Sequence, residues 1–387
     1  MKNKDIAIIG YSETKIGHRT NRSVYDLGGE AFAKLLAHTG VDKDKIDGLS
    51  LTAPTSEANP FVASYMCEAL GLEPAWLNLS ALGGCSALGS IARAMSAIRD
   101  GQCETVVVLS ADAPSSFNRM RHGAYRPEFI DPVGVQGPPG YFGLLLSRYM
   151  EQYDLIPEAL GKIAITQREH AVLNDNAYEK FRQKITMEDY LGSRMVSDPL
   201  RLLDSVMFCD GANAVMVTST ENAKKLGIKK MVHPIGYAEI CNYQGSKATP
   251  DITETGFGLV GPKALKQAGM TPADIRMFHP YDDFTVAVML KMEQIGFCER
   301  GHGSRFILDT DLSYKGKLPL NTGGGQISAG QPGLAGGGLN LVEAVRQMFG
   351  EAGARQVDNP KNAMVTGIGV IPYGRNWANS SVMILEH

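Results

Sequence analysis

The sequence predicts an α/β protein built from two similar halves, and two observations support this prediction. Apolar, strand-like runs alternate with helical patterns at both ends of the chain, which is typical of sheets covered by helices. The second half also repeats the order of the first. AKLLAHTGVDKDKIDGLS (33–50) and KALKQAGMTPADIRMF (263–278) both run from a helix through a glycine, a polar loop and an isoleucine to a strand. TVVVLSADAP (105–114) has a counterpart in NAMVTGIGVIP (362–372), and several matches in one order indicate a duplicated fold.

The individual elements follow from the same patterns. In the first half we predict strands at 6–9, 48–52 and 105–110 and helices at 24–38 and 85–99. The rhythm breaks at 116–199, where RMRHGAYRPEFIDPVGVQGPPGY is rich in Pro, Gly and Arg, and it resumes with DGANAVMVTS (210–219). The expected organisation is therefore an N-terminal half over 1–222, with 116–199 as an inserted segment, and a C-terminal half over 223–387.

Composition excludes several classes of function. A charged fraction of 20% with 44% apolar residues is that of a globular protein, and a net charge of -3 gives no electrostatic case for binding nucleic acid or a membrane. The six cysteines form no CxxC pair, so we expect neither a disulfide framework nor a zinc site. The N-terminus enters a strand at once, and no apolar run approaches the roughly 18 residues of a membrane span. We therefore expect a cytoplasmic protein.

The sharpest local feature is Cys85, which stands in LGGCSA at the predicted start of the helix 85–99. The first N–H groups of a helix lack intrahelical acceptors, and the positive end of the helix dipole lies there. Both effects favour the thiolate, which is the nucleophilic form of cysteine. The alternative is a small buried residue at a tight strand-to-helix turn, and the sequence leaves both interpretations open.

Three further segments contain candidate binding groups. NTGGGQISAGQPG (321–333) has small residues that let backbone N–H groups reach a ligand, although it lacks the lysine of a P-loop and a structural turn is the alternative. In HPYDDF (279–284), Tyr281 ends a strand, where open α/β folds bind ligands. Asp282 or Asp283 is expected to cap the helix that follows. GIGVIPYG (367–374) is a glycine turn after a buried strand, and an ordinary β-turn is its alternative.

The inserted segment carries a basic cluster formed by Arg119, Arg121, His122 and Arg126. Clustered arginines suit the recognition of phosphate groups. A solvated loop is the alternative interpretation.

Taken in order, these segments resemble the thiolase superfamily over essentially the whole chain, and most nearly its sterol-carrier-protein-X or lipid-transfer branch. GCS (84–86) matches the nucleophile turn of the family. YDDF (281–284) falls where this branch carries His-Asp-Cys-Phe, SAGQP (328–332) at the Gly-His-Pro motif, and GIG (367–369) at Cys-x-Gly. The resemblance implies the thiolase fold, in which two α/β halves form five layers, α-β-α-β-α, with an inserted loop domain.

The same resemblance implies roles for individual residues, and three positions depart from the family pattern. Gln331 replaces the histidine that activates the nucleophile, Gly367 the second cysteine, and Tyr281 an asparagine or histidine. A glutamine amide is not basic, so Gln331 is expected to position a carbonyl. The N–H groups of Gly369 and Cys85 are expected to form an oxyanion hole, and Tyr281 to donate a proton to an enolate or alkoxide. Coenzyme A binding is assigned to Arg119, Arg121, His122, Ser328 and Ala329.

The leading hypothesis is a thiolase-type acyltransferase that forms an acyl-Cys85 intermediate from a 3-oxoacyl-CoA. The loop 323–333 is most similar to variant thiolases that convert 2-benzoylsuccinyl-CoA and coenzyme A to benzoyl-CoA and succinyl-CoA, and Gly367 is expected to enlarge the site for such a substrate. Two alternatives remain open. One is a retro-aldol lyase for hydroxyacyl-CoA thioesters of the steroid side-chain type that uses Tyr281, and the other is a non-catalytic subunit that binds acyl-CoA or lipid.

The resemblance also implies partners and cofactors. We expect coenzyme A as a co-substrate and no covalently bound cofactor. A homodimer of thiolase subunits is expected, together with a small zinc-ribbon/OB-fold partner protein, and zinc is expected only in that partner.

Overall fold

The larger of the two main sheets in the computed structural model belongs to the first half of the chain. The structure describes residues 4–117, 127–135, 137–248, 251–369 and 377–387. The five strands of this sheet lie in the order β1-β7-β4-β2-β3. They are β1 (Ile6–Glu13), β2 (Gly48–Thr52), β3 (Trp76–Ser80), β4 (Thr105–Asp112) and β7 (Gly211–Ser219). β2 pairs in parallel with β3 and β4, and β7 runs antiparallel to both β1 and β4.

The second sheet repeats this arrangement with strands from the other half. Its order is β8-β11-β10-β9, with β8 (His233–Cys241), β9 (Met277–His279), β10 (Asn362–Ile368) and β11 (Asn379–Glu386). Leu320 forms a parallel bridge to Phe278 of β9 and so takes the place that β3 has in the first sheet. In both sheets the first strand of the half pairs antiparallel with its last strand. The prediction of two similar α/β halves is confirmed.

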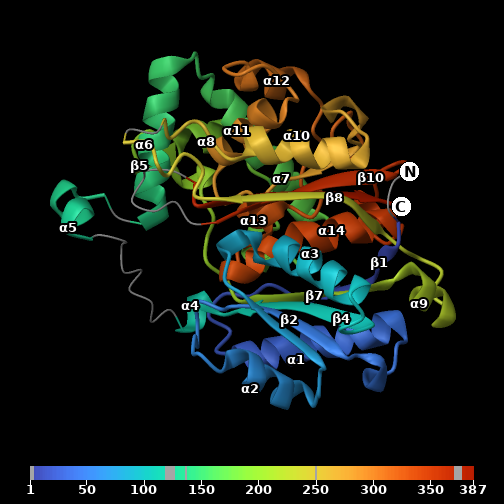
Figure 1. Cartoon of the computed structure of the whole chain (residues 1–387). Helices are drawn as coiled ribbons and strands as arrows, with labels where there is room; N and C mark the ends of the chain where they lie inside the picture. The colour runs from blue at the N-terminus through green and yellow to red at the C-terminus, as the bar shows by residue number, and fades with distance from the viewer. Residues whose placement is uncertain (1–3, 118–126, 136, 249–250, 370–376) are drawn as a thin grey trace.

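Helices cover both sheets and fill the space between them, which gives the five layers expected (Figure 1). The outer helices of the first sheet are α1 (Val24–Thr39) and α2 (Val62–Leu70), whereas α3 (Ser86–Arg99) and α14 (Gly336–Met348) lie between the sheets. The outer helices of the second sheet are α10 (Phe257–Ala268), α11 (Thr285–Ile295) and α12 (Gly303–Asp309). Two short helices, α9 (Thr220–Lys225) and α13 (Gly325–Ala329), complete the two halves.

The repeated segment is the same local structure in both halves. α1 ends at Gly40 and α10 ends at Gly269, with φ angles of 67° and 62° in the left-handed region that glycine adopts without strain. Each glycine is followed by a 3-10 turn, Lys43–Lys45 or Pro272–Asp274. Ile46 and Ile275 then turn into the core.

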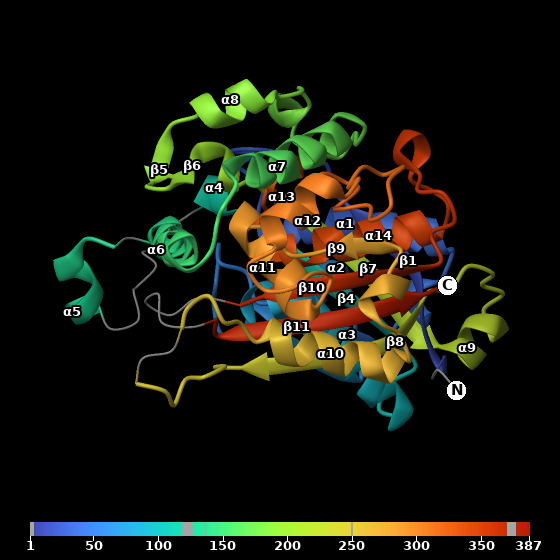
Figure 2. The ribbon, with the colours of Figure 1, turned by 90° about the horizontal axis from the view of Figure 1, so that it is seen from above.

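The inserted segment packs on the C-terminal half. In this segment or at its ends lie α4 (Pro114–Phe117), α5 (Pro127–Ile130), α6 (Gly137–Gln152), α7 (Pro157–Val172), α8 (Met187–Gly192) and the two-stranded sheet of β5 (Met195–Ser197) and β6 (Leu200–Arg201). α4 begins before residue 116, and β6 follows residue 199. Figure 2 shows α7 lying over α12 and α13. The Phe142 ring stacks on Phe284 with 4.1 Å between centroids, and Lys162 Nζ donates to the carbonyls of Leu308 and Thr310. The boundaries at 116, 199 and 222 stay predictions.

No helix in the described ranges is long and apolar enough to cross a membrane.

Candidate active site

Cys85 lies between the two sheets, where it ends a 3-10 turn (Gly83–Cys85) that leads directly into α3. Its exposed fraction is only 1%. Burial raises the pKa of the Cys85 thiol to about 12, and the nearby Ser381 and Lys291 oppose this shift only in part. Removal of the anion from water therefore opposes the thiolate that the helix start favours. The nucleophilic role of Cys85 stays a prediction.

Glycines surround Cys85 because the backbone is crowded there. A Cβ on Gly84 would lie 2.2 Å from the Tyr281 ring, and a Cβ on Gly337 would lie 2.5 Å from the Gly84 carbonyl oxygen. A Cβ on Gly367 would lie 2.7 Å from Cys85 Cα. The expectation that Gly367 enlarges the site is therefore wrong, because the missing side chain is replaced by the close approach of Cys85. Gly367 lies within β10 and Gly369 follows this strand, while residues 370–374 of the predicted glycine turn lie outside the described residues.

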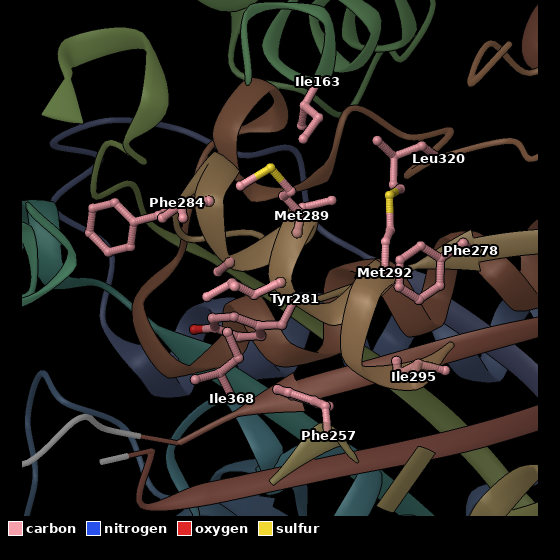
Figure 3. Close-up of a cluster of buried hydrophobic side chains, with 14 of the residues drawn as sticks. Ile163, Phe257, Phe278, Tyr281, Phe284, Met289, Met292, Ile295, Leu320 and Ile368 are labelled. Atoms are coloured by element: carbon pink, nitrogen blue, oxygen red, sulfur yellow. The ribbon is translucent and has the colours of Figure 1, made fainter. Parts of the chain in front are cut away.

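Tyr281 follows β9 and packs its ring over Gly84. Its N–H donates to Thr366 Oγ1 at 3.0 Å, and its hydroxyl accepts a long hydrogen bond of 3.4 Å from Gln331 Nε2. Figure 3 shows the ring beside Ile368 at the edge of a buried apolar cluster. Burial raises the pKa of Tyr281 well above its usual value, and the Asp283 carboxylate adds to the shift. Tyr281 is therefore a protonated hydrogen-bond donor at neutral pH.

Gln331 is held by its backbone at the end of the glycine-rich loop. Its N–H donates to the Met207 carbonyl at 3.1 Å, and its carbonyl accepts from Cys209 N–H at 2.8 Å. The side-chain oxygen Oε1 is buried and has no hydrogen-bond partner in the described structure. Sequence reasoning expected an amide that positions a substrate oxygen, and the structure brings Gln331 next to Tyr281.

The predicted oxyanion hole is contradicted. Gly369 N–H donates to the Asn379 carbonyl at 2.8 Å, and Cys85 N–H donates to the Leu82 carbonyl at 3.2 Å. Both groups are therefore used by the backbone, one beside the β10–β11 pair and the other in the 3-10 turn, and neither remains for a substrate oxyanion.

The residues assigned to coenzyme A are only partly described. Ser328 and Ala329 lie in α13, where Arg168 Nε donates to Ser328 Oγ at 3.3 Å and Tyr178 N–H donates to the Ala329 carbonyl at 2.9 Å. These contacts fix α13 to the inserted segment, and the binding role stays a prediction. Arg119, Arg121 and His122 lie outside the described residues.

Asp282 caps a helix, but a different helix from the one expected. It accepts hydrogen bonds from the N–H groups of Gln326 and Ile327 at 2.9–3.2 Å and from Asn340 Nδ2 at 3.1 Å. These N–H groups belong to the first turn of α13, whereas α11 begins after Phe284 without a side-chain cap. The glycine-rich loop thus folds around a buried carboxylate.

Sequence reasoning missed Lys291, which is completely buried in α11. Its Nζ donates to the Tyr281 carbonyl at 2.5 Å and lies over the rings of Phe257 and Trp377. The available signal was one lysine within the otherwise apolar run VAVMLKM (286–292).

A cavity of about 560 Å³ lies elsewhere, at the end of α6 and the start of α12. Its lining includes Tyr153 and Arg300, and Cys85 is not among its lining residues. Since it contains none of the candidate catalytic groups, we do not assign the active site to it.

Two stacked, duplicated sheets with a cysteine at the start of a central helix define a thiolase-type α/β protein. Residues 238–387 match the family model described as thiolase C-terminal domain-like. The chain is 33% identical to the steroid side-chain-cleaving aldolase of Thermomonospora curvata over 94% of this chain and 95% of that protein. It is 30% identical to the 17-hydroxy-3-oxo-4-pregnene-20-carboxyl-CoA lyase of Mycobacterium tuberculosis over 94% and 96% of the two chains. The chain therefore belongs to the thiolase superfamily of acyl-CoA enzymes, in its SCP2-thiolase-like branch.

One solved structure and one further relative bear on the finer predictions. The structure described as "Ltp2-ChsH2(DUF35) aldolase" superimposes with a TM-score of 0.85 at 29% identity, covering 100% of this chain and 98% of that one. The benzoylsuccinyl-CoA thiolase subunit BbsB of Thauera aromatica is 33% identical, but over only 59% of this chain and 60% of that protein. The comparisons thus favour the aldolase alternative over the leading hypothesis.

Proposed function

We propose that this chain is an aldol-type lyase that cleaves the C2–C3 bond of a 3-hydroxyacyl-CoA thioester. The observation that carries the proposal is the enclosed thiol of Cys85, which is 1% exposed and has a pKa raised to about 12. A thiolase needs this sulfur as a thiolate nucleophile, whereas retro-aldol cleavage needs only a base and an acid. Two relatives that match nearly the full chain, an aldolase and a lyase, support the same reaction class.

Tyr281 is the proposed acid. Its phenol stays protonated because burial raises its pKa, so it can donate to the thioester oxygen as enolate charge develops there. Gln331 donates to the Tyr281 hydroxyl and directs its proton toward the substrate.

The proposed substrate carries a bulky acyl group of the steroid side-chain type on coenzyme A. This follows the names of the two relatives that match nearly the full chain. An acyl-Cys85 thiolase acting on 2-benzoylsuccinyl-CoA has weaker support, because BbsB matches only 59% of this chain.

The proposed assembly contains a second copy of this chain and a small partner protein. β3 is an edge strand whose Leu77 and Leu79 are 43% and 38% exposed, so it offers apolar side chains and unpaired backbone groups to a second sheet. The similar solved structure is an aldolase together with ChsH2(DUF35), which supports a small partner protein for this chain. The zinc-ribbon/OB-fold character of that partner is the one implied by the family resemblance.

Two substitutions distinguish the lyase from the thiolase. The chain, co-expressed with its partner, is assayed with 17-hydroxy-3-oxo-4-pregnene-20-carboxyl-CoA in the absence of free coenzyme A. We expect Tyr281→Phe to lower turnover by about 10²–10⁴-fold, while Cys85→Ala stays within about threefold of the wild type. Tyr65→Phe, at a 48% exposed tyrosine, is the matched control.

The opposite pattern identifies the other candidates. Loss of activity in Cys85→Ala, with a requirement for free coenzyme A and 2-benzoylsuccinyl-CoA as the better substrate, would establish the thiolase. Binding of coenzyme A without turnover of either substrate would indicate a non-catalytic subunit.

A further inference from the structure

Two adjacent carboxylates beside Tyr281 have opposite surroundings. Asp282 is fully buried and accepts from two backbone N–H groups and an asparagine amide. Asp283 is half-buried as a whole residue, but its carboxyl oxygen Oδ1 is buried and has no hydrogen-bond partner in the described structure. Asp282 is therefore occupied by the fold, whereas Asp283 has an oxygen free to accept a proton.

The buried cation Lys291 contacts the backbone of the same segment. Lys291 has three N–H donors, one of which is given to the Tyr281 carbonyl at 2.5 Å. The aromatic rings of Phe257 and Trp377 lie 5.2 and 5.9 Å from its Nζ. A charge in such a position is expensive unless an opposite charge is near. Asp283 and Asp282 both raise the pKa of Lys291, against the effect of burial.

The electrostatics couple these groups to each other. Burial raises the pKa of Asp283, and attraction to the Lys291 ammonium works against this rise. Burial lowers the pKa of Lys291, and Asp283 and then Asp282 work against that change, with the Cys85 thiol adding a smaller effect. The Asp283 carboxylate also adds to the rise in the pKa of Tyr281 that burial causes. The carboxylate, the phenol and the ammonium therefore form one interacting set.

We propose that Asp283 is the general base of the lyase reaction, and that Lys291 is a positioning residue that keeps the Asp283 carboxylate charged and holds Tyr281 in place. This inference rests on the lyase function proposed above and supplies the base that the family histidine would otherwise provide, since Gln331 cannot accept a proton.

The proposed step balances without a further reactant. Asp283 takes the proton of the C3 hydroxyl, the oxygen forms the carbonyl of the released ketone or aldehyde, and the C2–C3 bond breaks. Its electron pair forms the enolate of the shortened acyl-CoA, to which Tyr281 donates a hydrogen bond. The proton held by Asp283 then passes to C2, which restores the carboxylate.

The test compares pH profiles of kcat/KM for the partner complex with 17-hydroxy-3-oxo-4-pregnene-20-carboxyl-CoA. Asp283→Asn is expected to lose at least about 100-fold in kcat with little change in KM, because an amide cannot accept the proton. Lys291→Met is expected to remain active at high pH. As the pH is lowered, its kcat/KM should begin to fall at a pH at least about one unit higher than in the wild type. Loss of the ammonium raises the pKa of Asp283, so the base is protonated sooner as the pH is lowered.

Lys162→Met is the matched control, because Lys162 also donates to two backbone carbonyls but lies away from this set. It should lower stability without moving the acid limb of the profile. An Asp283→Asn variant within threefold of the wild type, or an unmoved acid limb in Lys291→Met, overturns the inference and leaves the lyase proposal intact.

A second measurement does not depend on the substrate. Infrared difference titration should show a carboxyl band that is absent from Asp283→Asn and becomes protonated at higher pH in Lys291→Met. An unchanged titration in Lys291→Met overturns the inference. If the wild type shows the expected titration but does not cleave the thioester, the lyase proposal fails on its own.

Discussion

The two central helices begin in the same way but with different residues. α3 follows a 3-10 turn that ends at Cys85, and α14 follows a 3-10 turn that ends at Ala335. Both residues are enclosed, with exposed fractions of 1% and 0%. The two starts also approach each other, since a Cβ on Gly337 would lie 2.5 Å from the Gly84 carbonyl oxygen. The duplicated fold thus makes two equivalent buried helix starts.

This comparison shows that a helix start does not by itself create a reactive thiol. Raising the pKa of Cys85 from 9.0 to about 12 corresponds to about 4 kcal/mol in favour of the neutral thiol. A helix terminus supplies at most about 2 kcal/mol to a nearby charge. Desolvation therefore determines the protonation state of Cys85. The buried position that holds the apolar Ala335 before α14 favours an uncharged cysteine before α3.

The two central helices differ most in the ion pairs near their middles, which are buried in α14 and exposed in α3. Glu343 of α14 is buried and pairs with Arg346 at 2.7 Å and Arg355 at 2.9 Å. Arg93 of α3 pairs with Glu239 at 2.9 Å, but both side chains are 38% exposed. We expect Glu343→Gln to lower the free energy of unfolding by about 3–5 kcal/mol, because it removes the buried carboxylate that Arg355 and Arg346 share and leaves Arg346 paired with Glu13 alone. Arg93→Met should cost less than about 1 kcal/mol.

The pH dependence of stability provides a second readout of the same network. The Arg355 and Arg346 guanidinium groups hold the pKa of Glu343 well below its usual value, against the effect of burial. A carboxylate whose folded-state pKa is depressed stabilises the protein above its unfolded-state pKa, and this contribution is lost as the pH falls toward the folded-state value. Urea unfolding should therefore show wild-type stability falling below about pH 4.5 more steeply than in Glu343→Gln. Equal slopes would contradict the network.

A smaller effect is expected where the two helix starts meet. Gly337→Ala should destabilise the protein by about 3 kcal/mol, because its Cβ collides with a backbone oxygen that cannot rotate away. Gly29→Ala in α1 is the control, because a Cβ there meets nothing within 4 Å. That variant should gain up to about 1 kcal/mol from the helix propensity of alanine. Thermal and urea unfolding measure both, and a neutral Gly337→Ala would show that the helix starts do not touch.

Local patterns made the scaffold predictable from the sequence. The bounds of β2 and the ends of α1 and α10 at Gly40 and Gly269 follow from short-range periodicity and glycine chemistry. The position of Cys85 at a helix start was equally local. Its ionisation was not, because the desolvation that sets the pKa comes from strands and helices far away in the sequence.

Contacts between residues far apart in the sequence also explain the wrong predictions around the site. Asp282 was expected to cap α11, its neighbour in sequence, but it caps α13, which arrives more than forty residues later in the chain. The local sequence predicts a free Gly369 N–H for an oxyanion hole, but this N–H pairs with the carbonyl of Asn379, which comes from the next strand. Lys291 has no local motif at all, and only the folded arrangement brings its ammonium to the Tyr281 carbonyl.

The smallest expected effect tests how equal the two halves are. Gly40→Ala and Gly269→Ala each place a side chain on a left-handed residue at the end of a helix, and neither Cβ meets an atom within 4 Å. Each should lower the free energy of unfolding by about 1 kcal/mol through backbone strain alone. Because the surroundings match, the two losses measured by urea unfolding should agree to within about 0.5 kcal/mol and add in the double variant. If only one variant lost stability, the two halves would share the same fold, but the equivalent glycines would contribute differently to the free energy of unfolding.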